Sequence, residues 1–418
     1  MRDIFVGYCC SVCGKEYAPD QVTYVCPDDG GNLDVVLDFD RIADQVTQGE
    51  IINSREPSLW RYLPLLPVSD PGGYMTPLRA AGWTRVYQPN QLIQATGVQK
   101  LWIKDESSNP TASFKDRASA LLVARAQDIE AEVIVTASTG NAGAALAGMC
   151  AAVGRRAVIF APKTAPPAKI AQLLVFGAEV ILVDGTYDDA FALAVEATDE
   201  FGWYCRNTGY NPFTAEGKKT VSFELWEQAM MRNPDEEKPY NIFISVGDGN
   251  IIAGAHKGFK DLLALGWIQQ MPRFFGVQST GSAAITNAFL ANTEDIRPVR
   301  ATTLADSISV DKPSDGLRAL RAATQTGGAY IQVPDEAILA AIPLLGSVGI
   351  FAEPAGATAY AGFLQALADG VIQPDEPTIV INTGSGLKDV RSASRSVGEA
   401  PVIAPSMAAL HAYLAERD

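Results

Sequence analysis

The sequence predicts an α/β fold built from two open, mostly parallel sheets that share one cleft, with a small appendage at the N-terminus. Short buried-strand runs alternate with helical segments between Val133 and Cys205, and a second set of the same kind runs from Ile242 to Ile381. Such alternation is typical of parallel sheets that helices cover on both faces. Four of the six cysteines lie in the first 26 residues, which sets this end of the chain apart from the two sheets.

Composition limits the kind of protein this can be. The chain has 418 residues, 47% hydrophobic and 19% charged, as expected for a soluble globular protein with a large core. Its formal charge of −15 argues against nucleic acid or an anionic membrane as a partner, because both need a basic surface. The first residues lack the features of a signal peptide, and no apolar run reaches membrane-spanning length. We therefore expect a cytoplasmic protein with reduced cysteines.

The strand and helix patterns divide the chain into three parts. Residues 1–37 form the appendage, residues 131–225 a small mobile α/β domain, and residues 38–130 together with 226–418 a large α/β domain. Residues 39–84 contain several prolines and predict an irregular connection. The expected strands are Leu101–Ile103, Val133–Thr136, Ala157–Phe160, Val180–Val183, Trp203–Cys205, Ile242–Ser245, Phe274–Val277 and Thr378–Ile381. The expected helices are Ala142–Val153, Pro166–Phe176, Asp188–Phe201 and one after Asn250.

The N-terminal cysteines have the spacing of two facing metal knuckles. Cys10 and Cys13 form the first, and Cys26 begins a second in which Asp29 stands where another cysteine would complete the pattern. Zinc accepts carboxylate oxygen, so one interpretation is a structural zinc site made of three cysteines and one aspartate. The other is a zinc-ribbon-like knuckle that holds no metal and is stabilised by packing.

One lysine has the surroundings of a carbonyl-reactive amine. Lys115 lies in the segment 109–117, among small hydroxyl residues and next to Phe114, with Arg117 two positions later. A lysine amine becomes nucleophilic near neutral pH when burial or a neighbouring cation lowers its pKa. Taken alone, the segment fits a charged run on the surface at a helix start better.

Three polar turns follow predicted strands. Residues 138–143 open a helix with backbone N–H groups and hydroxyl and amide donors suited to a carboxylate. The glycine-rich residues 245–254 open another and suit a small phosphate, because no Gly-Lys-Ser/Thr nucleotide loop is present. After the last strand, Thr383 offers a hydroxyl to a ring nitrogen. Together with the amine of Lys115, these features describe a pyridoxal 5'-phosphate site.

These motifs occur in the order found in one known family. The chain resembles the threonine synthases of the tryptophan-synthase-β-like (fold type II) family of pyridoxal phosphate enzymes over nearly its whole length. The resemblance implies a homodimeric carbon–oxygen lyase that converts O-phospho-L-homoserine and water to L-threonine and phosphate, with the cofactor in the large domain. It assigns catalysis to Lys115. It assigns cofactor binding to Lys115, Phe114, Asn141, Gly247, Asp248, Gly249, Asn250 and Thr383, and substrate binding to Ser138, Thr139, Gly140, Asn207, Thr208 and Lys218.

The sequence departs from the family where the substrate's phosphate is expected. Ala142 replaces a threonine, and Thr214 stands at the position of an expected arginine, so a charge-assisted contact is lost. Lys218 or Lys219 is a candidate to compensate. The departures leave two alternatives to a threonine synthase: a related lyase or β-replacement enzyme acting on serine, threonine or an O-activated serine, and a catalytically silent binding relative.

Overall fold

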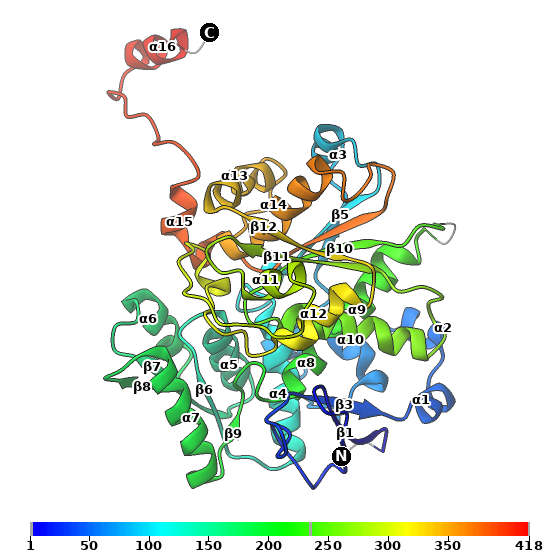
Figure 1. The fold of residues 1–418 in the computed structure, drawn as a ribbon. Helices are drawn as coiled ribbons and strands as arrows, with labels where there is room; N and C mark the ends of the chain where they lie inside the picture. Colours follow the sequence, from blue (N-terminus) through cyan, green and yellow to red (C-terminus); the bar gives the residue numbers. More distant parts are fainter. Residues whose placement is uncertain (1–2, 234–235, 417–418) are drawn as a thin grey trace.

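The computed structural model describes residues 3–233 and 236–416, and it confirms the predicted α/β fold class (Figure 1). In these residues the strands form sheets with the orders β12-β11-β10-β13-β5-β4, β8-β7-β6-β9 and β2-β1-β3. The strands are β1 (Phe5–Cys10), β2 (Glu16–Tyr17), β3 (Leu33–Leu37), β4 (Arg85–Tyr87), β5 (Leu101–Asp105), β6 (Val133–Ala137), β7 (Arg156–Pro162), β8 (Glu179–Val183), β9 (Tyr204–Cys205), β10 (Asn241–Ser245), β11 (Arg273–Ser279), β12 (Ala329–Val333) and β13 (Thr378–Asn382).

Helices make up most of the rest of the described chain. The longer ones are α4 (Lys115–Asp128), α5 (Asn141–Ala152), α6 (Pro167–Val175), α7 (Tyr187–Phe201), α10 (Asn250–Ala264), α12 (Gly316–Thr324), α13 (Asp335–Gly346), α14 (Pro354–Ala368) and α16 (Met407–Ala415). The shorter ones are α1 (Phe39–Gln45), α2 (Gln48–Ile52), α3 (Asn90–Thr96), α8 (Phe213–Lys218), α9 (Thr220–Leu225), α11 (Ala284–Leu290), α15 (Val390–Ser394), and the 3-10 or π turns η1 (Leu59–Leu65), η2 (Pro77–Ala80), η3 (Glu106–Ser108), η4 (Trp226–Met230), η5 (Asp306–Ile308) and η6 (Gly386–Lys388).

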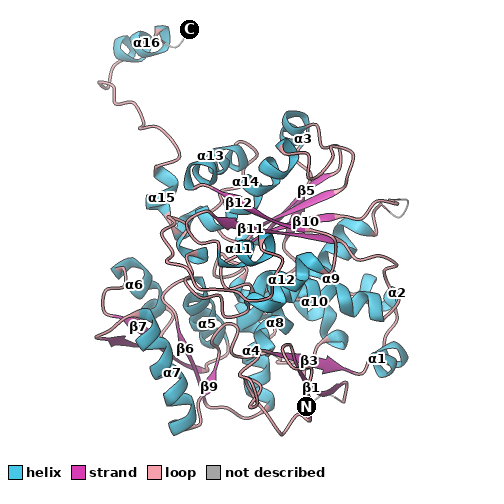
Figure 2. Ribbon diagram, viewed as in Figure 1, coloured by secondary structure: helices cyan, strands magenta, loops and turns pink. Residues whose placement is uncertain are grey.

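The six-stranded sheet is parallel except at one edge, where β4 runs antiparallel to β5. In its centre Ile242 lies opposite Phe274 on one side and Ile379 on the other. Helices α13 and α14 cover one face of this sheet, and α10 and α12 cover the other (Figure 2). All five residues of β10 are therefore buried, which explains why an uninterrupted apolar run predicted this strand.

The four-stranded sheet is fully parallel, with β6 between β7 and β9. Alternate residues such as Val133 and Val135 point to the alanines of α7, and Ile134 belongs to the opposite face. Helix α5 is rich in alanine and glycine, so its backbone lies close to α4. A Cβ on Gly148 would come within 2.6 Å of Thr111, just before α4. This close packing joins the small sheet to the helix that begins with Lys115.

The N-terminal appendage contacts segments that flank both larger sheets. Arg318, on α12, donates to the carbonyl of Leu33 at 3.2 Å and to the carboxylate of Asp34 at 2.7 Å. Tyr24 stacks on Tyr210, just after β9, with ring centroids 4.6 Å apart. The appendage thus bridges the large and small sheets.

Residues 39–84, expected to be irregular, contain α1, α2, η1 and η2 instead. Asp38 and Thr47 accept hydrogen bonds from the N–H groups of Arg41 and Glu50, and these caps start the two α-helices. Strand β12 was not predicted either, because its sequence, Ala-Tyr-Ile-Gln-Val, is neither alternating nor uniformly apolar. All eight expected strands are present, with ends that differ from the prediction by at most two residues.

The proposed division at residues 130 and 225 stays a prediction. Helices α8 and α9, which precede the second boundary, pack against α4 and α10. At the C-terminal end, α16 lies away from the body at the tip of an extended segment and has no buried residue (Figure 1). Within residues 3–233 and 236–416, no helix is both long and apolar enough to cross a bilayer.

Candidate active site

Lys115 is held at the start of α4 by the loop that follows β13. The N–H of Phe114 donates to the carbonyl of Thr383 at 2.9 Å, and the N–H of Ser385 donates to the carbonyl of Ala112 at 3.1 Å. Burial lowers the pKa of Lys115, and Arg206 lowers it further, against the opposing effect of Glu353. The lysine therefore gains neutral, nucleophilic character relative to a lysine in water.

The turn between β10 and α10 forms a cradle for an anion. Gly249 has φ of 94°, and a Cβ there would lie 2.6 Å from the Cβ of Ala319. A Cβ on Gly247 would lie 2.8 Å from the Cα of Ile308. Only glycine fits both positions. The first N–H groups of the 15-residue helix α10 emerge here, and its dipole favours a negative charge.

A cleft of about 470 Å³ joins Lys115 to this cradle. Ser245 and Thr383 line it at the carboxyl ends of β10 and β13, the edge of an open parallel sheet where ligands bind. The hydroxyl oxygen of Ser245 is buried without a hydrogen-bond partner in the described protein. The cleft is lined by Lys115, Thr208, Lys218, Ser245, Val246, Gly247, Asp248, Gly249, Asn250, Ile251, Ile252, Ser307, Ile308, Glu353, Ala355 and Thr383.

An adjoining cavity of about 310 Å³ contains Gly140 and Asn141. The side-chain amide of Asn141 donates to Glu353 at 2.9 Å. Burial raises the pKa of Glu353, and the bond from Asn141 only partly offsets this. Glu353 borders both cavities, yet no role could be predicted for it from the sequence, because one carboxylate before a proline resembles an ordinary helix start.

The remaining substrate residues expected from the sequence lie on loops at the carboxyl end of the small sheet. Asn207 is buried and accepts hydrogen bonds from the hydroxyl of Thr136 and the N–H of Ala137, both at 2.9 Å. Ser138 and Thr139 precede α5 and are partly exposed. The residues that line the two cavities include Thr208, Gly140 and Asn141 but not Ser138, Thr139, Asn207 or the fully buried Phe114.

Lys218 is fully buried and lines the cleft, where its ammonium group donates to the side-chain oxygen of Asn250. Burial lowers the pKa of Lys218, and the nearby charges of Lys115 and Arg206 add to this. Thr214 is also fully buried, with its hydroxyl 2.7 Å from the carbonyl of Asn211 and 3.2 Å from the Asn250 side chain. Lys219, the other candidate, pairs with Glu216 and Asp261 instead and faces away from the cleft lining.

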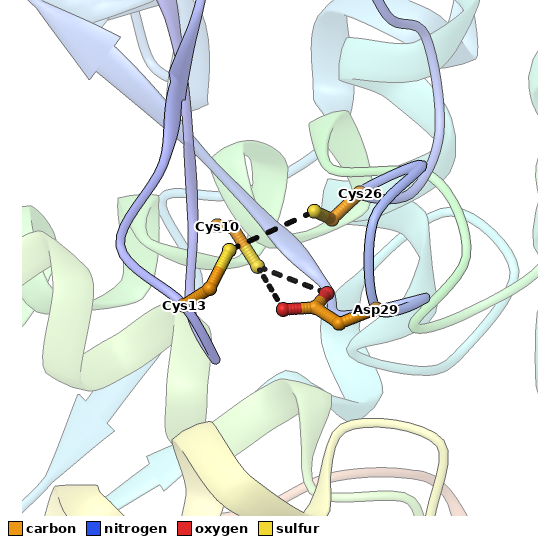
Figure 3. Close-up of side chains that lie close together, drawn as sticks. All are labelled: Cys10, Cys13, Cys26 and Asp29. Carbon is orange, nitrogen blue, oxygen red and sulfur yellow. Dashed lines mark hydrogen bonds between the residues drawn. The ribbon is translucent and has the colours of Figure 1, made fainter.

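The four expected metal ligands converge at the N-terminal knuckle (Figure 3). The ligand atoms of Cys10, Cys13, Cys26 and Asp29 all lie within 4.8 Å of one another. The Sγ of Cys10 is 3.4 Å from a carboxylate oxygen of Asp29, and the Sγ atoms of Cys13 and Cys26 are 3.8 Å apart. Three sulfurs and one oxygen at this spacing suit a tetrahedral ion such as zinc.

Comparison with known proteins identifies the family. Residues 78–384 match the family described as pyridoxal-phosphate dependent enzyme. The chain is 37% identical to the threonine synthase of Methanocaldococcus jannaschii over 97% of this chain and 99% of that protein. The chain belongs to the threonine synthase family. It is also 36% identical to the threonine synthase of Methanosarcina acetivorans over 91% of each chain, and 33% identical to that of Halalkalibacterium halodurans over 84% of this chain and 96% of the other.

Solved structures of low sequence identity share the fold of this family member. The processed form of threonine deaminase isoform 2 from Solanum lycopersicum superimposes with a TM-score of 0.66 at 23% identity, covering 80% of this chain and 92% of that one. O-ureido-L-serine synthase superimposes with a TM-score of 0.65 at 17% identity, covering 82% and 99%.

The cleft fits the cofactor of the pyridoxal-phosphate dependent enzymes. It supplies an amine of lowered pKa, a glycine turn that only an unsubstituted backbone can form, and the unpartnered hydroxyl of Ser245. Lys115 would hold the cofactor's carbonyl carbon, and the Gly247–Asn250 turn its phosphate.

Proposed function

We propose that the protein is a pyridoxal phosphate-dependent threonine synthase, which converts O-phospho-L-homoserine and water to L-threonine and phosphate. The observation that carries this proposal is the near full-length similarity to threonine synthases, together with an amine and an anion cradle in one cleft. This reaction removes a phosphate by breaking a carbon–oxygen bond and therefore belongs to the lyases.

The bound cofactor supplies an electron sink for the negative charge left when a proton leaves carbon. The residues of the chain would bind and orient the substrate and move protons. The amine of Lys115 would carry protons between the substrate's carbons, because one flexible amine reaches successive positions. The loops at Ser138–Gly140 and at Asn207–Thr208 would hold the substrate from the small-sheet side, and closure of that side would exclude water until it is needed.

The cofactor contacts are part of the same proposal. Thr383 would face the ring nitrogen, and Phe114 would flank the ring from its buried position. Asn141 would donate to the ring hydroxyl, and its amide already points to a buried acceptor, Glu353, in the adjoining cavity.

The decisive experiment follows threonine and phosphate together from O-phosphohomoserine, using cofactor-loaded protein and Lys115→Ala. We expect equal amounts of both products from the wild type and none from the variant. Lys163→Ala is a matched control, since Lys163 is an exposed lysine paired with Asp184 and should leave turnover unchanged. Cofactor absorption without phosphate release in the wild type would contradict this activity while leaving the family assignment intact.

A second candidate is a lyase or β-replacement enzyme acting on serine, threonine or an O-activated serine. Thr214 and Ala142 favour it, because neither residue supplies a charge for a substrate phosphate. Release of a keto acid from serine or threonine, at a rate above that of threonine formation, would support this alternative.

We further propose a structural zinc ion at Cys10, Cys13, Cys26 and Asp29, and a homodimer in the cytoplasm. The converging ligand atoms support the zinc ion, and one equivalent of zinc per purified chain, lost in Cys26→Ser, would test it.

The exposed apolar residues of the C-terminal segment, including Val402, Met407 and Leu414, support self-association, which the mass of the protein in solution would test.

A further inference from the structure

The starting observation is a buried cation without a carboxylate. Nine lysines and arginines are buried among the described residues, and six of them form ion pairs with Asp or Glu: Arg61, Lys104, Arg117, Lys219, Lys257 and Arg318. The other three are Arg125, Arg206 and Lys218. Arg125 lies over the ring of Phe213, with its Cζ 4.7 Å from the ring centroid, and Lys218 donates to Asn250. Arg206 has neither kind of partner, which is costly for a buried charge.

Arg206 is fully buried, and its Nη2 has no hydrogen-bond partner in the described protein. Its Nη1 donates to the hydroxyl of Thr208 at 2.7 Å, and its Nε donates to that of Ser119 at 3.3 Å. Both partners are neutral, and no carboxylate of residues 3–233 and 236–416 forms an ion pair with Arg206. Burial lowers the pKa of Arg206 to about 10, which leaves it charged at neutral pH.

The contacts of Arg206 place it beside the cleft. Ser119 lies one helical turn after Lys115 on α4, so the two side chains share a face of that helix. Thr208 lines the cleft together with Lys115 and Lys218. Arg206 itself follows β9, which runs parallel to β6, and the carboxyl ends of both strands point toward the substrate side.

The cleft must accept two phosphates if the proposed function is correct. The N-terminus of α10, with Lys218 next to Asn250, would hold the phosphate of the cofactor. Thr214 carries no charge for the phosphate of the substrate, and its hydroxyl already donates to the carbonyl of Asn211 and the side chain of Asn250. A guanidinium with a free N–H group, held beside a cleft-lining hydroxyl, has the chemistry that a phosphate monoester requires.

We propose that Arg206, together with Thr208, binds the phosphate of the substrate and replaces the arginine that is absent at position 214. The proposal rests on the proposed function for the identity of the substrate. The binding of a phosphate monoester at Arg206 does not depend on which reaction the protein catalyses.

The test uses cofactor-loaded full-length protein with Arg206→Gln, Arg206→Lys and the control Arg125→Gln, a buried arginine held by aromatic rings away from the cleft. KM and kcat for O-phosphohomoserine are measured, and inorganic phosphate and L-threonine are titrated against the cofactor's absorption. Arg206→Gln should raise KM and the dissociation constant of phosphate by on the order of 10- to 100-fold, the effect of losing one charge-assisted contact. L-Threonine, which has a carboxylate but no phosphate, should bind as in the wild type. Arg206→Lys should recover part of the loss, and Arg125→Gln should leave KM unchanged.

Wild-type KM and phosphate affinity in both Arg206 variants would overturn the proposal. Equal weakening of phosphate and L-threonine would also overturn it, because that result assigns Arg206 a structural role. If Arg206→Gln does not fold, the titrations of Arg206→Lys with inorganic phosphate and L-threonine decide whether the proposal holds. A wild type that forms no threonine yet binds phosphate through Arg206 would reject the proposed function and keep the phosphate subsite.

Discussion

At the scale of single residues, burial decides which side chains carry a charge. Lys115 and Lys218 are both drawn toward neutrality by burial, and the positive charge of Arg206 adds to the effect on each. A bound anion would reverse part of this shift, because it would stabilise the ammonium forms. The same pocket can therefore present a neutral amine for attack and a cationic wall for phosphate, depending on which ligand is present.

His256 provides a test of burial acting on one group. It lies on α10 with only 5% of its surface exposed, and its ring centroid is 5.6 Å from that of Phe274. Burial lowers the pKa of His256 from 6.5 to about 3, with a smaller contribution from Lys260 and an opposing one from Asp34. Below pH 6.5 the unfolded chain binds a proton at His256, whereas the folded chain does not until the pH approaches 3. The contribution of the neutral His256 to stability is therefore fully present above pH 6.5 and is lost progressively as the pH falls toward 3.

In His256→Leu, the free energy of unfolding should fall less steeply with acidification. The difference in slope should approach, at most, about 1.4 kcal/mol per pH unit between pH 6 and 4. Urea unfolding at several pH values measures it. His411→Leu, at an exposed position on α16, is the control and should keep the wild-type slope. Parallel pH profiles for wild type and His256→Leu would contradict the prediction.

The residues that could be predicted from the sequence are those that lie in short motifs. Lys115 and the Gly247–Asn250 turn could be predicted, since each lies in a short segment whose residue types suit one chemistry. Arg206 and Glu353 could not, because their importance comes from burial and from neighbours far away in the chain. Thr214 in place of an expected arginine stays a prediction from the resemblance, and only the folded chain shows which other arginine lies beside the cleft.

At the scale of elements, the N-terminal knuckle is connected to the phosphate cradle. The side-chain amide of Asn32 donates to the carbonyls of Gly209 and Ser314, the second at 3.1 Å. Ser314 in turn donates through its hydroxyl to Asp248 at 3.0 Å and to the carbonyl of Thr208 at 3.2 Å. One hydrogen bond from Asn32 to Ser314 and a second from Ser314 to Asp248 thus link the appendage to the turn proposed to hold the cofactor's phosphate. The sequence indicated the knuckle but gave no sign of this connection.

Asn32→Ala should therefore weaken cofactor binding, although Asn32 lies outside the cleft. Loss of two hydrogen bonds that position a loop should raise the dissociation constant of pyridoxal phosphate by about 5- to 10-fold, or about 1 kcal/mol. Titration of cofactor-free protein with pyridoxal phosphate, followed by absorption, measures this. Asn53→Ala removes a similar bond, from an amide to the carbonyl of Gly49 at 2.8 Å on α2, and should bind as the wild type. Equal affinity in both variants would disprove the coupling.

At the scale of the whole molecule, a buried charge network joins segments that the sequence places far apart. Glu224 on α9 accepts from Lys104 on β5 at 2.6 Å and from Arg117 on α4 at 2.5 Å, and all three side chains are fully buried. Burial alone would raise the pKa of Glu224, but Arg117 and Lys104 outweigh it and hold the pKa at about 2. The strands could be predicted from their apolar runs, whereas neither their order in the sheet nor this network could be, because both depend on residues far apart in the chain.

Glu224→Gln should lower the free energy of unfolding at pH 7 by about 3–5 kcal/mol, because it leaves the buried Lys104 without a carboxylate partner and Arg117 with Glu106 alone. Below pH 4.5 the unfolded chain takes up a proton on Glu224, whereas the folded chain keeps it ionised down to about pH 2, so the gap in stability between wild type and variant should narrow as the pH falls. Urea unfolding at pH 7 and near pH 3 measures both effects. Asp375→Asn makes the same chemical change in an exposed pair with Lys238 and should alter stability little, since solvent screens that pair. If the two variants lose equal stability at pH 7, or if the gap for Glu224→Gln stays constant with pH, the network does not hold these elements together through its charge.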